Sequence, residues 1–216
     1  MQPLITTNIL AIVLLSVLVI SASLNYLRSF FFAYGKRKHF VIYEVPYDAV
    51  KNLKSILGLV HPPFTFEVAV SQLGKEKSYY LTLPSHRAGK LKGLSGARKI
   101  DDYDVYYPGG TVVGGYGVSE KTIDKLDIDK IDFSGVNEIG EGAVVQFVVK
   151  KKGGGKLTVN IRALVSAPSS FQAKEIFAGM KDSLKGVQLR EVKSAEFINM
   201  VNAREFSDKE AATLAI

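Results

Sequence analysis

The sequence contains no cysteine, which excludes disulfide bonds, thiolate metal sites and a cysteine nucleophile. Its three histidines, His39, His61 and His86, are isolated, and none stands at a metal-ligand spacing from another. A P-loop is not indicated either: the Gly-Lys pairs at 89–90 and 155–156 lack the first glycine of that motif and its final Ser or Thr. The sequence therefore predicts no catalytic residue, no metal site and no cofactor.

Lys, Arg, Asp and Glu are absent from the first 27 residues, and Arg28 is the first charged side chain. Between Ile9 and Ile20, Ser16 is the only polar residue. About 20 helical residues rise roughly 30 Å, which is enough to cross the hydrocarbon core of a bilayer. Because a chain in lipid must pair its own backbone groups, we expect a transmembrane helix within residues 4–27.

Positive charge follows this apolar run instead of preceding it. Arg28, Lys36, Arg37 and Lys38 are predicted to flank the membrane and contact lipid. The positive-inside rule then gives a single-pass protein of the inner membrane, with its N-terminus outside and its C-terminal region in the cytoplasm. A cleaved signal peptide ending near residues 21–23, which would release a secreted or surface protein, is the alternative.

The remaining chain is predicted to be α+β, with two small ferredoxin-like units behind the transmembrane helix. Residues 1–38 form the anchor and its basic flank. Residues 39–108 follow a β-α-β-β-α-β order, with a helix over 47–60, a hairpin over 64–84 and a last strand over 101–107. Strict alternation in the first hairpin strand places Phe64, Phe66, Val68 and Val70 on one face. Residues 109–142 are interpreted as a Gly-rich linker and charged segment. Residues 143–216 are the second unit, in which a helix after Pro168 carries an apolar stripe of Ala173, Ile176, Phe177, Met180 and Leu184. Its C-terminus is predicted to be helical over 195–201 and 207–216, with Ser207 and Glu210 at the spacing of a capping box.

Several of these segments resemble a known family. The stretches FTFEVAVSQLGKEKSYYLTLP (64–84), DDYDVY (101–106), EGAVVQFVVKK (141–151), LTVNIRALVSAP (157–168) and AREFSDKEAATLAI (203–216) resemble the membrane-anchored N-terminal region of bacterial type IV secretion or conjugation ATPases. The polar residues that carry the resemblance are Glu67, Asp102, Gln146 and Arg162. The ATPase domain itself is missing, so the resemblance implies a place in a membrane-associated assembly, with such an ATPase or further copies of the chain as partners.

The leading hypothesis is therefore a non-enzymatic protein that acts in protein–protein assembly, with partners recruited by sheet edges or apolar patches. A membrane-tethered nucleic-acid-binding module is the alternative. In that alternative Arg87, Lys90 and Lys92 contact nucleic acid or lipid, and one tyrosine of the Tyr79-Tyr80 pair stacks on a base.

Overall fold

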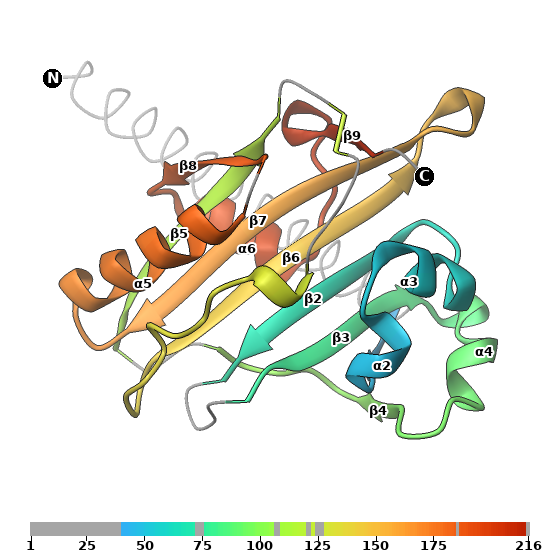
Figure 1. The fold of residues 1–216 in the computed structure, drawn as a ribbon, viewed down its shortest axis with the longest axis horizontal. Coiled ribbons are helices and arrows are strands. Elements are labelled where there is room, and N and C mark those ends of the chain that lie inside the picture. Colours follow the sequence, from blue (N-terminus) through green and yellow to red (C-terminus); the bar gives the residue numbers. More distant parts are fainter. Residues whose placement is uncertain are drawn as a thin grey trace, which may run out of the picture. The chain divides into compact units, whose positions relative to one another are not determined.

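The computed structural model describes residues 40–71, 76–105, 109–119, 122–123, 128–184 and 186–214. In these residues nine strands form a single antiparallel sheet, in the order β4-β1-β3-β2-β6-β7-β5-β8, and β9 pairs with β7 (Figure 1). The strands are β1 (Phe40–Glu44), β2 (Phe64–Val70), β3 (Ser78–Pro84), β4 (Arg98–Ile100), β5 (Thr111–Val118), β6 (Gly142–Lys151), β7 (Leu157–Ala167), β8 (Gln188–Val192) and β9 (Ala212–Leu214). The α-helices are α2 (Tyr47–Val50), α3 (Leu53–Leu59), α4 (Gly89–Lys92), α5 (Ser170–Ser183) and α6 (Ala195–Asn202), and the 3-10 turns are η1 (Ser85–Arg87), η2 (Ile128–Lys130), η3 (Gly153–Gly155) and η4 (Asp208–Glu210).

The prediction of two small ferredoxin-like units behind a transmembrane helix is wrong. Strand β2 pairs with β6 from Phe64↔Val149 to Val70↔Ala143, so strands from both predicted units belong to one sheet. The predicted linker, residues 109–142, contributes strand β5 to the same sheet. The chain repeats one connectivity, since β4-β1-β3-β2 corresponds to β8-β5-β7-β6, but the β2–β6 pairing joins the two halves into one structure.

The predicted single-pass placement in the inner membrane also requires correction. The longest described helix, α5, has 14 residues, and no helix in the described ranges is long and apolar enough to cross a bilayer. Fourteen helical residues rise about 21 Å, well short of a hydrocarbon core of about 30 Å. The predicted span within 4–27 and the basic flank formed by Arg28, Lys36, Arg37 and Lys38 lie outside the described residues.

One face of the sheet carries the larger core and is covered by α2, α3, α4 and α5 (Figure 1). The predicted alternation in β2 is confirmed, because Phe64, Phe66, Val68 and Val70 all face this core. The predicted apolar stripe of α5 is confirmed as well. It consists of Ala173, Ile176, Phe177, Met180 and Leu184, which are all buried.

The opposite face is covered near its centre by α6, which lies behind β6 and β7 in Figure 1. Its apolar cluster is smaller, with Phe197 and Val201 of α6 packed against Leu164. Polar side chains occupy much of the remaining buried area, including Glu67, Gln146 and Arg162. This face therefore combines a helix-covered core with a polar interior.

Local structure departs from the sequence predictions in three places. The helix predicted over 47–60 is broken into α2 and α3 because Asn52 caps α3, accepting a hydrogen bond from the Ser55 amide at 2.9 Å. The strand predicted at 101–107 is wrong over 101–105, which form no strand, and β4 lies at Arg98–Ile100; residues 106–107 lie outside the described residues. The helix predicted over 207–216 is wrong over its described part, 207–214, which forms the turn η4 followed by β9.

Candidate functional site

A polar network crosses the centre of the sheet beneath α6. Glu67, Gln146 and Arg162 are direct register partners on β2, β6 and β7, so their side chains share one face. Gln146 Nε2 donates to Glu67 Oε1 at 2.8 Å and to the Val201 carbonyl at 2.9 Å. Arg162 Nη1 donates to Gln146 Oε1 at 3.3 Å, which completes the row.

The C-terminal segment closes this network with ion pairs. Arg204 Nε donates to Glu67 Oε2 at 2.8 Å, and its Nη2 donates to Asp102 Oδ1 at 3.0 Å. Arg162 Nε donates to Glu210 Oε2 at 2.9 Å. All four polar residues on which the family resemblance rests therefore meet in one network.

The chemistry of this network is structural. Each buried carboxylate lies against a guanidinium group, so charge is balanced inside a poorly solvated region. Burial raises the pKa of Tyr103 well above its usual value, and the charge of Glu67 adds to the effect, so the phenol stays protonated. Its ring stacks on Tyr80 with centroids 3.9 Å apart. The network fixes the C-terminal segment on the sheet and presents no activated nucleophile.

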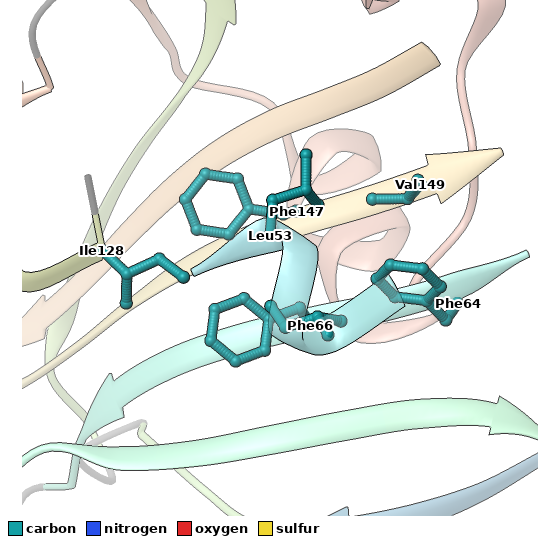
Figure 2. Close-up of a pocket in the computed structure, with 7 residues that line it drawn as sticks. Leu53, Phe64, Phe66, Ile128, Phe147 and Val149 are labelled. Atoms are coloured by element: carbon teal, nitrogen blue, oxygen red, sulfur yellow. The ribbon is translucent and has the colours of Figure 1, made fainter. Parts of the chain in front are cut away.

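A small apolar cavity lies between α3 and the sheet (Figure 2). Its lining consists of Leu53, Ile56, Phe64, Phe66, Ile128, Phe147 and Val149. Its volume of about 10 Å³ is at the lower limit for one water molecule, and the apolar lining offers a water nothing to bond. Pockets that bind drug-sized ligands usually measure about 300–1,000 Å³, so this cavity is a packing defect.

The three basic residues predicted to contact nucleic acid or lipid lie together at one corner of the sheet. Arg87 Nη1 donates to the Pro62 carbonyl, and Lys90 Nζ donates to the Gly58 carbonyl at 3.1 Å. These bonds attach the segment that contains η1 and α4 to the end of α3. Lys92 is exposed and has no hydrogen-bond or ion-pair partner among the described residues.

Both tyrosines of the pair, one of which was predicted to stack on a base, already contact other aromatic rings. The Tyr79 ring contacts Tyr47, with centroids 5.4 Å apart, and Tyr80 lies against Tyr103 in the buried cluster. Open aromatic faces are what bind successive bases in single-stranded nucleic acids. The arrangement of these tyrosines does not provide such a platform.

An apolar side chain is presented at the tip of the loop that precedes β6. Ile139 is 84% exposed. The loop is braced from within by the buried carboxylate of Glu141, whose Oε2 accepts the backbone amides of Asn137 at 2.8 Å and Glu138 at 2.9 Å. Gly140 has a φ of +93°, a conformation that suits glycine and turns the chain back toward β6.

A second exposed apolar side chain lies beside this loop, at the start of α5. Phe171 is 76% exposed because it falls on the side of the helix away from the buried stripe. Gln172 Nε2 donates to Glu138 Oε2 at 3.1 Å, which joins the helix to the loop. Ser169 Oγ caps α5 by accepting the Gln172 amide at 3.2 Å. We call Ile139 and Phe171 the apolar tip.

Sequence reasoning did not single out either residue of the apolar tip. Ile139 lies in the weakly patterned segment 120–142, where no periodicity indicates which residues are buried. Phe171 offers a usable signal, since it falls outside the helical spacing of the stripe that begins at Ala173. A large apolar residue on the polar side of an amphipathic helix favours a contact outside the core.

No protein-family model, no curated protein and no solved structure matches this chain. The resemblance to the N-terminal region of secretion or conjugation ATPases stays a prediction from the sequence.

Proposed function

We propose that the chain is a non-catalytic protein-binding module that contributes to the assembly of a larger protein complex. The apolar tip carries this proposal. Ile139 and Phe171 are 84% and 76% exposed, on two segments that are hydrogen bonded to each other. Neither side chain stabilises the fold by burial, whereas a partner that covered them would gain about 1.5–3 kcal/mol from each.

The bracing of the loop supports a binding role over a passive turn. Glu141 is 3% exposed and uses its carboxylate to hold two loop amides. A tip that is already ordered loses little conformational entropy when a partner binds, so more of the contact energy appears as affinity. The expected partner surface is an apolar pocket wide enough for an isoleucine and a phenylalanine.

The identity of the assembly rests on the resemblance alone. A secretion or conjugation-type apparatus, and a ring of several copies, are what the resemblance implies. That the chain is not an enzyme is part of the same proposal. Its support is that the sequence lacks catalytic motifs.

The test compares the unaltered chain with the double variant Ile139→Ser and Phe171→Ser. Proteins captured by each from extracts of the source cells are quantified, and the captured candidate is purified and titrated against both chains. Sedimentation velocity of the two chains shows whether the partner is a second copy. We expect at least about a tenfold loss of affinity in the double variant, because two apolar anchors are removed.

The variant Phe40→Ser is the matched control, since Phe40 is another exposed phenylalanine, at the start of β1. It is expected to bind like the unaltered chain. The proposal is wrong if the purified candidate binds the double variant as tightly as the unaltered chain. It is also wrong if the unaltered chain retains no protein above background and sediments as a monomer.

A further inference from the structure

Strongly basic segments contain α3, η1, α4 and β4, and Figure 1 shows α3, α4 and β4 at one end of the sheet. We call this region the basic corner and define it as residues 51–63 and 85–100. These two segments contain no Asp or Glu. They contain seven exposed cationic residues, Lys51, Lys54, Arg87, Lys90, Lys92, Arg98 and Lys99.

Hydrogen bonds hold η1 and α4 against the end of α3, so the charges of these three elements lie near one another. Arg98 and Lys99 follow on β4, where adjacent residues face opposite sides of the sheet. Lys90 Nζ reaches the carbonyl of Gly58, and Gly58 is one helical turn from Lys54 on α3. Arg87 binds the Pro62 carbonyl on the same side. The positive potential of the corner therefore comes from both segments at once.

Few of these charges are neutralised. Arg98 pairs with Glu44, and Arg87 and Lys90 donate to backbone carbonyls. The remaining four ammonium groups, on Lys51, Lys54, Lys92 and Lys99, have no hydrogen-bond or ion-pair partner among the described residues. Like charges held close together repel, and an anionic partner would relieve that repulsion.

The basic corner includes one end of the sheet. In the described part of the chain β4 pairs with β1 alone, so the other side of Arg98–Ile100 presents backbone groups that no strand covers. An extended polypeptide can add to such an edge through main-chain hydrogen bonds. Nucleic acids and lipid headgroups carry charge but cannot extend a β-sheet.

We propose that the basic corner binds an extended, carboxylate-rich segment of a partner protein, which adds as a strand to β4 while its acidic side chains contact Lys92, Lys99 and their neighbours. The inference rests on the proposed function only in taking a protein as the partner. The basic corner is a surface separate from the apolar tip, so an experiment can contradict one proposal without contradicting the other. Nucleic acid is the less favoured ligand because the nearby Tyr79 and Tyr80 rings are occupied by other aromatic rings.

Edge lysines also have a protective role, since charge on an edge strand discourages aggregation. That role alone predicts no affinity for any acidic peptide. It predicts only that removing the charge lowers solubility, so a binding measurement separates the two roles.

The probe is a labelled peptide of about twelve residues in which Glu alternates with Val or Thr, a pattern that favours an extended strand. A second peptide of equal charge has proline in place of Val and Thr, which removes half of its main-chain N–H donors and makes it a poor strand. Fluorescence anisotropy with the full-length chain measures both affinities at low and high salt. DNA of about 20 nucleotides, single- and double-stranded, and vesicles of phosphatidylserine and phosphatidylcholine in equal parts are measured alongside.

The test variant is Lys92→Glu with Lys99→Glu, which avoids the contacts that Arg87 and Lys90 make within the fold. The control variant is Lys174→Glu with Lys181→Glu, which reverses two exposed charges on α5. We expect the test variant to bind the first peptide about tenfold more weakly, the control to bind it like the unaltered chain, and the proline peptide to bind several-fold more weakly. Equal binding of both peptides, tighter binding of DNA or vesicles, or no effect of the test variant would each overturn the proposal.

Discussion

Arg204 joins two carboxylates that lie far from it in sequence, and this makes it the most informative residue of the polar network. Burial alone would lower the pKa of Arg204, but Glu67 and other acidic neighbours raise it above its ordinary value, so the guanidinium stays charged. Its side chain is 13% exposed and that of Glu67 is 3% exposed. Removing one member of such a pair leaves an uncompensated charge in a poorly solvated place.

We expect Arg204→Ala to lower the free energy of unfolding by about 3 kcal/mol, because Glu67 is left without its cation. Urea denaturation followed by circular dichroism measures the change. Asp102→Asn provides the comparison, since Asp102 is 52% exposed and its pair with Arg204 should contribute less than about 1 kcal/mol. Equal losses in the two variants would contradict the role assigned to Glu67.

Tyr47 provides a residue-scale prediction in alkaline solution. A hydrogen bond to Asp129, with burial adding to it, raises the pKa of Tyr47 from 10.0 to about 12. The folded chain therefore keeps this proton over a range where the unfolded chain loses it. The stability that it provides is complete below pH 10 and is lost as the pH rises toward about 12.

We expect Asp129→Asn to return the pKa of Tyr47 toward 10. The ultraviolet absorbance of tyrosinate is measured for each chain and for the same chain with Tyr47→Phe. The difference between the two titrations belongs to Tyr47. The Tyr47→Phe variant should also lose less stability than the unaltered chain between pH 10 and 12. An unchanged Tyr47 titration in Asp129→Asn would show that the hydrogen bond is not the cause.

At the scale of elements, the glycines of β5 explain why a segment interpreted as a linker is a buried strand. A Cβ added at Gly115 would lie 2.5 Å from the Arg190 carbonyl oxygen and 2.8 Å from Phe177 Cζ. A Cβ at Gly117 would lie 2.4 Å from Val187 Cγ1. Because these glycines have no side chain, α5 and β8 can approach β5 closely. The high glycine content of this segment therefore indicates close packing.

We expect Gly115→Ala to destabilise the fold by about 1–3 kcal/mol through overpacking, because backbone must move to admit the methyl group. Gly179→Ala is the matched control, since Gly179 lies within α5 with nothing within 4 Å of its added Cβ. That substitution should stabilise the chain by roughly 0.5–1 kcal/mol through helix propensity. Thermal unfolding of both variants tests the contrast, and a flexible-linker role for β5 would predict little effect of Gly115→Ala.

Elements with strong local periodicity were predictable from the sequence. The strict alternation of β2 and the stripe of α5 depend on side chains within one element, and both appear as predicted. The C-terminal prediction failed for a non-local reason: Ser207 gives its amide to Asn160 Oδ1 at 2.7 Å, and Glu210 binds Arg162. Neither residue makes the helix-capping bond that their spacing suggests, because contacts across the sheet replace it.

At the scale of the whole molecule, one core extends through both halves of the sheet. Phe66 on β2 and Phe147 on β6 stack at their junction with ring centroids 6.0 Å apart, and the larger core contains residues of every strand from β1 to β3 and from β5 to β7. Halves that share a core should unfold together.

We expect Phe66→Ala to lower the free energy of unfolding by about 3–5 kcal/mol, and we expect both halves of the sheet to lose this stability. Hydrogen exchange measured by mass spectrometry should show the amides of β3 and of β7 becoming less protected by the same free energy. A loss of protection confined to β1, β2 and β3 would show that the halves open independently.

The candidate site was less predictable than the fold elements, for a reason that holds across the molecule. Basic residues such as Lys92 are visible in the sequence, but their contacts and the free edge of β4 depend on strand order. The apolar tip arises because a loop and a helix start meet through Glu138 and Gln172, which are 34 residues apart. Pairings of this kind follow from topology and cannot be obtained from local patterns.

The late position of Arg204 has a consequence for synthesis on the ribosome. Its carboxylate partners precede it by 137 and 102 residues, so they emerge into water long before their cation is translated. Until then this sheet face presents hydrated charged and amide groups beside apolar side chains, such as Leu164, that α6 later covers. The last segment to be translated therefore supplies both the cation for the buried carboxylate and the cover for the apolar cluster.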